Sequence, residues 1–258
     1  MKKIATRVSY GNTLVELARQ GADNLVVFDA DLAAATKTEI FRKEFPDRHF
    51  DCGIAEQNMV GVAAGMATMG YVPFVSSFAM FVAGRGFEQI RNSIGYPHLN
   101  VKIAATHAGI TVGEDGGSHQ ALEDINLMRG LPNMTVLVPA DGPEAYKAVM
   151  AAAAYDGPVY IRLGRSAVPT VTDPDADFVI GKGKLLREGT DVTLIACGMM
   201  VAVALDAAEL LAAEGVNAAV IDMSTIKPID RALICEWAEK TGAVVTAEEH
   251  NIIGGLGE

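Results

Sequence analysis

Basic residues, cysteines and aromatic residues are all scarce in this sequence of 258 residues. Lysine and arginine number 21 against 32 acidic residues, and the resulting formal net charge of −11 argues against nucleic acid or an anionic membrane as the main partner. The three cysteines, Cys52, Cys197 and Cys235, have no metal-binding or redox spacing. Because an odd number of cysteines favours reduced thiols, we expect a cytoplasmic protein.

Long uninterrupted hydrophobic segments are also missing. Residues 57–84 carry no charge, but Gln57, Asn58 and Pro73 divide them into shorter pieces. A membrane-spanning helix needs about 20 consecutive apolar residues, so we expect no membrane partner. The residues before Arg7 do not form the apolar core of a secretory signal.

Apolar segments that are typical of buried strands alternate with helical patterns along the chain. Half of the residues are hydrophobic, and this alternation predicts an α/β fold with two domains built on parallel sheets. In the first domain the pattern predicts strands at 25–28, 71–76, 101–106, 135–138 and 158–163, and helices at 11–20, 38–45, 78–93, 122–129 and 143–154.

A second, smaller α/β unit follows a segment rich in proline and aspartate. We place the first domain at 1–168, a linker at 169–186 and the second domain at 187–258. The second domain is expected to contain three parallel strands and to be incomplete, and its last residues, 249–258, are expected to begin another helix. Its predicted strands are 192–197, 218–222 and 243–248, and its predicted helices are 202–213 and 230–241.

Glu56 stands where a strand or loop is expected to end and a helix rich in small residues begins. Unpaired N–H groups at a helix N-terminus favour a carboxylate or an anionic ligand. Glu56 also precedes the uncharged segment 57–84, so it is a candidate for exchanging a proton with a nitrogen base at the mouth of an apolar region. A structural carboxylate is the alternative interpretation.

His107 and His119 lie in a glycine-rich loop that follows the predicted strand 101–106. Glycines allow such a loop to approach a ligand closely. The two histidines are too far apart for a local zinc site and have no cysteine beside them, so recognition of sugar hydroxyls is the better functional hypothesis. A tight surface turn is the alternative.

Two aromatic residues and two arginines complete the candidates. Phe78 and Phe81 are three residues apart, on one face of an expected helix, where they either hold a flat ring or pack in the core. Arg7 and Arg165 lie near the ends of expected elements, where they either bind a phosphate or are solvated at the surface.

Five segments, in this order and spacing, resemble transketolases. The resemblance covers essentially the whole chain and corresponds to the carboxyl-terminal part of a transketolase, namely the pyrimidine-binding domain and the start of the third domain. The Gly-Asp-Gly motif of the amino-terminal domain is absent from this sequence. The five segments are Asp51-Cys-Gly-Ile-Ala-Glu-Gln-Asn-Met-Val60, Phe78-Ala-Met-Phe81, Gly113-Glu-Asp-Gly-Gly-Ser-His-Gln120, Pro139-Ala-Asp-Gly142 and Ile226-Lys-Pro228.

The resemblance implies a subunit of a split transketolase, a transferase of pentose phosphate chemistry that moves a two-carbon ketol unit from a ketose phosphate to an aldose phosphate. Thiamine diphosphate and Mg²⁺ would be held mainly by a separate amino-terminal subunit, so no metal ligand is expected in this chain. The two subunits would form an α2β2 heterotetramer.

The resemblance also implies a role for each candidate near the cofactor. Glu56 would be catalytic, through a hydrogen bond to N1′ of the thiamine aminopyrimidine that favours its imino tautomer. Phe78 and Phe81 would line the pocket of the same ring. Gly84 stands where many transketolases have a third aromatic residue, so the ring pocket is expected to be looser.

The remaining candidates would bind the sugar phosphates. His107 and His119 would be catalytic residues that contact the substrate near the reacting centre, and Asp115 would bind a donor hydroxyl. Arg7 and Arg165 would bind the phosphate.

The sequence departs from the family pattern at the expected phosphate site. Ala35, followed by Thr36, stands where the family often has serine, and residues 116–118 replace a common Gly-Pro-Thr or Gly-Pro-Ser. The alternatives are the β subunit of a 2-oxo-acid dehydrogenase, an enzyme similar to deoxyxylulose-phosphate synthase, or a regulatory binding subunit without activity.

Overall fold

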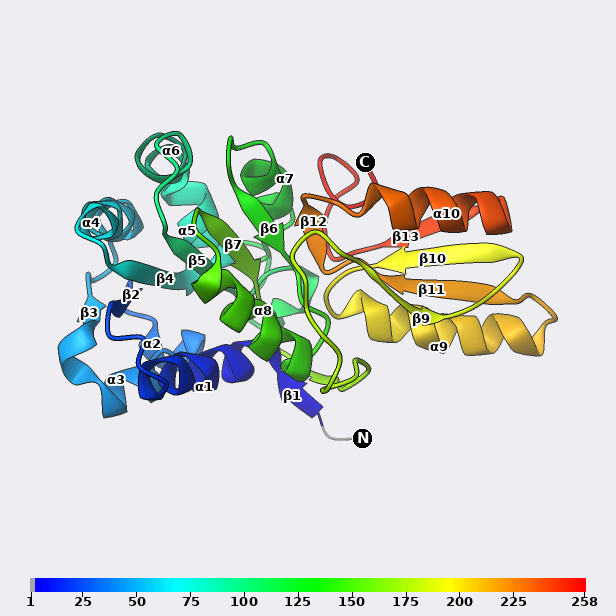
Figure 1. Cartoon of the computed structure of the whole chain (residues 1–258), viewed down its shortest axis with the longest axis horizontal. Coiled ribbons are helices and arrows are strands. Elements are labelled where there is room, and N and C mark those ends of the chain that lie inside the picture. The colour runs from blue at the N-terminus through cyan, green and yellow to red at the C-terminus, as the bar shows by residue number, and fades with distance from the viewer. Residues whose placement is uncertain (1–2) are drawn as a thin grey trace.

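In the computed structural model, which describes residues 3–258, a seven-stranded sheet and a four-stranded sheet lie end to end along the long axis of the molecule (Figure 1). Each sheet lies between helices, so the predicted α/β class with two units is confirmed. Within the described residues, no helix is long and apolar enough to cross a membrane.

The seven-stranded sheet has the order β12-β6-β7-β5-β4-β2-β3, and all pairs except β12·β6 are parallel. Every residue of β2, β5 and β7 is buried, as is typical of parallel strands that are covered on both faces. The bounds are Leu25–Asp29 for β2, His49–Asp51 for β3, Val72–Phe78 for β4, Lys102–Thr106 for β5, Thr135–Leu137 for β6, Val159–Arg162 for β7 and Thr225–Lys227 for β12.

The helices of the first unit form two layers (Figure 1). One layer packs on alternate strand residues such as Val27 and Phe74, and the other packs on Phe28 and Val75. The first layer contains α1 (Thr6–Arg19), α2 (Ala33–Thr36), α3 (Glu39–Glu44) and α8 (Gly142–Ala154). The second contains α4 (Glu56–Thr68), α5 (Ala79–Arg85), α6 (Phe87–Gln89), a π-helical turn (Ile90–Gly95) and α7 (Asp124–Arg129).

The predicted helix 78–93 is wrong at its beginning and in its continuity. Phe78 is the last residue of β4, and the helical segment that follows is divided into α5, α6 and the π-helical turn. Gly86 separates α5 from α6, and a Cβ there would lie 2.7 Å from the carbonyl oxygen of Val82. Close backbone packing at this glycine therefore interrupts a pattern that reads as one helix.

The second unit has four strands rather than the expected three, in the order β13-β10-β11-β9. The additional strand, β9 (Lys184–Arg187), is antiparallel to β11 and begins within the segment predicted as linker, 169–186. All four of its residues are only half buried, and charged residues stand at both of its ends, so no strand-like alternation identifies it. The other elements are β10 (Val192–Ala196), α9 (Met200–Ala213), β11 (Ala218–Asp222), α10 (Arg231–Thr241) and β13 (Val244–Ala247).

The two units are joined by paired strands and by a continuous apolar core. Strand β12 comes from the second unit in sequence but pairs with β6 of the first. Within the first unit, β1 (Lys3–Ala5) pairs with β8 (Ala167–Pro169). Met223 and Trp237 belong to the same buried cluster as Val136. The expected helix at 249–258 is not present. A segment of bends there folds back onto Glu248, which accepts the backbone N–H groups of residues 256 and 257.

Candidate active site

The candidate residues gather at the edge of the first sheet where its parallel strands end. Phe78 is the last residue of β4, and His107 directly follows β5. Polar loops at the carboxyl ends of such strands are the usual place for ligands in open α/β sheets. The fold therefore brings together side chains from segments that are far apart in the sequence.

Glu56 is the first residue of α4 and is only 2% exposed. Arg85 is its partner: Nη1 donates to both carboxylate oxygens, at 3.1 Å and 3.0 Å. The Arg85 side chain is 52% exposed, and its guanidinium carbon lies 4.4 Å from the centre of the Phe81 ring. The carboxylate is thus buried beside an aromatic face, with a cation at its open side that can move into solvent.

Four ring side chains form a continuous wall next to this carboxylate. Phe78 and Phe81 are stacked with centroids 5.7 Å apart, and Phe78 stacks on His107 at 3.8 Å. His119 meets Phe81 edge to face at 5.1 Å. The structure therefore brings both predicted histidines and both predicted phenylalanines into one group, which is suited to a flat heteroaromatic ring.

His107 is buried and held in an unusual backbone conformation, with φ of 58°. Its Nδ1 is hydrogen bonded to Thr106 Oγ1 at 2.9 Å. Burial, and then the nearby charges of Arg7 and Arg165, lower the pKa of His107 to about 3. His107 is therefore neutral at physiological pH and presents a neutral imidazole to the aromatic group.

Arg7 and Arg165 are brought together although 158 positions separate them. Arg7 Nε donates to the carbonyl oxygen of Arg165 at 3.2 Å, and Arg7 Nη1 donates to that of Ala35 at 2.5 Å. Arg165 donates to the carbonyl oxygen of Val112 and to the carboxylate of Glu114, both at 2.8 Å. Two guanidinium groups beside a neutral imidazole have the chemistry suited to an anionic ligand.

The loop between β5 and α7 carries His107, Asp115 and His119. Asp115 is exposed, between Gly113 and Gly116, both of which have positive φ. The loop is tied to the second unit, because the backbone N–H of Thr111 donates to Glu249 Oε1 at 3.1 Å. The aromatic contacts include His119 but not Asp115, whose proposed hydroxyl contact remains a prediction.

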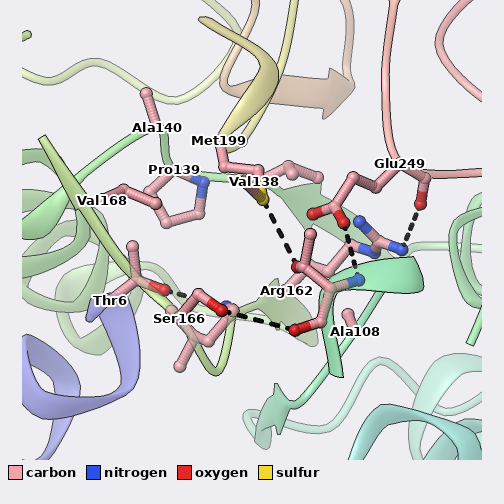
Figure 2. A pocket seen from close by; sticks show the side chains of 14 residues that line it. Thr6, Ala108, Val138, Pro139, Ala140, Arg162, Ser166, Val168, Met199 and Glu249 are labelled. Atoms are coloured by element: carbon pink, nitrogen blue, oxygen red, sulfur yellow. Dashed lines mark hydrogen bonds between the residues drawn. The ribbon is translucent and has the colours of Figure 1, made fainter. Parts of the chain in front are cut away.

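A small cavity lies beneath this loop, at the junction of the two units (Figure 2). Its volume is about 30 Å³, enough for one or two water molecules. Thr6 and Ser166, the neighbours of the two arginines, line it together with Arg162, Met199 and Glu249. Glu56 and the aromatic wall lie outside this cavity, so it is a packing gap at the junction rather than the candidate active site.

The sequence interpretation missed Arg85, Glu114 and Lys37. Arg85 is the first charged residue after the uncharged segment 57–84, and this position was a usable signal. Lys37 is one of the charges that lower the pKa of His107, after burial and the two arginines. Lys37 follows the expected phosphate-site residues Ala35 and Thr36, and Glu114 precedes Asp115 in the glycine-rich loop, so their positions in the sequence were also usable signals.

A metal site is not formed by the described part of the chain: residues 3–258 contain no group of three or more His, Cys, Asp or Glu side chains that could hold a metal ion. The residues do fit one part of a heterocyclic cofactor. A buried carboxylate lies beside an aromatic wall, and the positive charges of Arg7 and Arg165 lie near His107.

Comparison with known proteins gives consistent matches along the chain. Residues 2–171 match the pyrimidine-binding domain of transketolase, and residues 181–258 match the transketolase C-terminal domain. A putative transketolase C-terminal section of Methanocaldococcus jannaschii is 52% identical over 97% of this chain and 79% of its own length. Human transketolase is 43% identical over 99% of this chain, which spans 41% of the human protein.

A solved structure described as a split gene transketolase, an inactive β4 tetramer, is also similar. It has 59% sequence identity to this chain and a TM-score of 0.92. The match covers 99% of this chain and 83% of that one.

Proposed function

Because the chain belongs to the transketolase family, we propose that it is the carboxyl-terminal subunit of a split transketolase, which transfers a two-carbon ketol unit from a ketose phosphate to an aldose phosphate. The observation that carries the proposal is the position of Glu56, a buried carboxylate beside the aromatic wall. His107 connects that wall to the two arginines, so one site offers both a ring pocket and an anion-binding region.

Thiamine diphosphate is the proposed cofactor, and when bound it supplies a carbon nucleophile and an electron sink. Glu56 would hold a proton against the N1′ nitrogen of the aminopyrimidine ring, whose faces would contact Phe78 and Phe81. We assign its diphosphate and the Mg²⁺ ion mainly to an amino-terminal subunit.

A ring nitrogen bound at Glu56 would share the carboxylate with Arg85. Both carboxylate oxygens accept from the same Nη1 atom, so moving one contact would free one oxygen. The half-exposed guanidinium can take water in exchange, and its stacking on Phe81 need not change. Arg85 thereby keeps the carboxylate hydrogen bonded when the ring is absent.

The substrate would lie between the ring pocket and the arginines. Neutral His107 can donate a hydrogen bond to a sugar hydroxyl or carbonyl or accept one from a hydroxyl, and His119 meets the Phe78 ring edge to face at 6.1 Å. Asp115 is proposed to bind a donor hydroxyl. Arg7 and Arg165 would bind the sugar phosphate through charge-assisted hydrogen bonds.

We further propose that the active assembly is an α2β2 heterotetramer in the cytoplasm. A similar protein described as an inactive β4 tetramer supports the idea that the isolated chain self-associates but lacks activity. The exposed side of α4, with Gly61, Val62 and Gly65, is available for such contacts.

The test is to combine the chain with a separately produced amino-terminal transketolase subunit and to assay xylulose 5-phosphate with an aldose phosphate. Glu56→Gln should reduce turnover by a factor of about 10² to 10⁴, the usual contribution of a proton-transfer group. Glu239→Gln on the exposed side of α10 is the matched control and should change nothing.

Circular dichroism and thermal unfolding would show that the Glu56 variant is folded. Retention of near-wild-type turnover in Glu56→Gln would contradict the proposed role. If the complex used pyruvate and not xylulose 5-phosphate, the dehydrogenase or synthase alternative would replace the proposal. If no combination of subunits were active, the alternative of a regulatory binding subunit would replace the proposal.

A further inference from the structure

The short helical turn α2 holds two cations on neighbouring carbonyl groups. Arg7 Nη1 donates to the carbonyl oxygen of Ala35 at 2.5 Å, and Lys37 Nζ donates to that of Ala34 at 2.7 Å. Arg7 also donates to the backbone of Arg165. Arg7, Lys37 and Arg165 therefore lie near one another at the His107 end of the candidate site.

The position of Lys37 is built into the fold. Its φ of 76° is in the left-handed region, and the threonines on either side of it, Thr36 and Thr38, donate to the buried carboxylate of Asp29 at 2.8 Å each. A Cβ at Gly11 of α1 would lie 2.4 Å from the carbonyl oxygen of Lys37, so this glycine allows α1 to pack directly on the turn. These contacts fix the backbone of Lys37, and therefore the point from which its side chain extends.

The acidic residues nearby do not balance these three cations. Among residues 3–258, none of the ion pairs includes Arg7. Arg165 pairs with Glu114, whose carboxylate is largely exposed. Lys37 has only a long contact of 3.7 Å with Glu39. The positively charged side chains that bind these adjacent carbonyl groups repel each other. An anion bound between them would offset that repulsion.

We infer that Lys37 is a third cationic residue of the substrate phosphate site and a determinant of specificity for a sugar with a phosphate terminus. The inference rests on the proposed function and adds a residue to it. Position 35 carries no hydroxyl, because it is alanine, and the ammonium group of Lys37 supplies a donor to the same end of the site.

The chemistry requires only a change of side-chain conformation. Lys37 Nζ has three hydrogens and currently makes one short hydrogen bond, so it can turn toward a phosphate oxygen. Two guanidinium groups and one ammonium group carry enough positive charge for a dianionic phosphate.

The first experiment compares Lys37→Met with Lys43→Met in the reconstituted two-subunit enzyme. Lys43 is the matched control, since it pairs with the same Glu39 at 3.2 Å from an exposed position on α3. For a phosphorylated aldose acceptor, Lys37→Met should raise KM about tenfold, the usual effect of losing one charge-assisted hydrogen bond. With hydroxypyruvate as donor and an unphosphorylated aldehyde as acceptor, its KM values should match those of Lys43→Met. Lys37→Arg should restore most of the affinity.

The second experiment measures binding of inorganic phosphate to the full chain by calorimetry, which does not depend on turnover. Lys37→Met should bind about tenfold more weakly than Lys43→Met. Equal KM values for the phosphorylated acceptor, or equal phosphate binding by the two variants, would overturn the inference while wild-type turnover still supported the proposed function. An inactive wild-type complex whose chain shows the expected phosphate binding would refute the proposed function alone.

Discussion

The strongest stability prediction concerns the buried ion pair of Arg162 and Asp124. Arg162, the last residue of β7, donates Nε and Nη2 to the two carboxylate oxygens of Asp124 at 2.8 Å and 3.1 Å. Tyr160 donates to the same carboxylate at 2.7 Å. Arg162 also donates to the carbonyl oxygens of Ala121 and Glu249, so it ties the end of the loop between β5 and α7 to the second unit.

Burial determines how much the loss of Arg162 should matter. The two side chains are 5% and 1% exposed, so Arg162→Met would leave the Asp124 carboxylate without its cation and without access to water. Breaking such a pair from one side destabilises a protein by about 3–5 kcal/mol. The pair of Arg19 and Glu44 has the same two-bond geometry but is 65% and 36% exposed, so solvent screens it and its loss should change stability far less.

The assay is urea unfolding of the wild type, Arg162→Met and Arg19→Met, followed by circular dichroism. The double variant Arg162→Met with Asp124→Leu should recover part of the lost stability, because it removes the stranded charge. Similar losses for the buried and the exposed arginine would refute the reasoning, since the two pairs differ mainly in burial. A double variant less stable than Arg162→Met would contradict the electrostatic explanation.

Two further predictions concern proton binding. The pKa of His107, about 3, lies below the ordinary value of 6.5 because of burial and then the Arg7 and Arg165 charges. The NMR signals of its imidazole should therefore stay constant from about pH 5 to 8. A titration midpoint near pH 6.5 would contradict this prediction. The unfolded chain takes up that proton first, so the contribution of His107 to stability is complete above pH 6.5 and decreases as the pH falls toward 3. The carboxyl groups of Glu144 and Asp222 are fully buried and lie near each other across the junction. Burial raises the pKa of both carboxyl groups, so the folded chain retains a proton that the unfolded chain releases. Stability should therefore fall as the pH rises above the ordinary carboxyl range, and Glu144→Gln should flatten the dependence of the thermal midpoint on pH, whereas an unchanged slope would show that the pair does not control it.

The locally encoded features of the candidate site were predictable. Glu56 at the start of a helix and His107 after a strand could both be placed, because hydrophobic periodicity depends on residues within one or two turns. Strand β9 was missed for the same reason, since its half-buried residues have no clear period.

Contacts between distant segments followed only from packing. Arg85 is 29 positions from Glu56, and Arg7 is 158 positions from Arg165, yet each pair meets at one edge of the sheet. Strand β12 likewise pairs with β6 across the junction of the two units. The order of residue types along the chain specifies which elements form and which end of each carries polar groups. The partner of each charge depends on how those elements pack, because burial and distance are properties of the assembled fold.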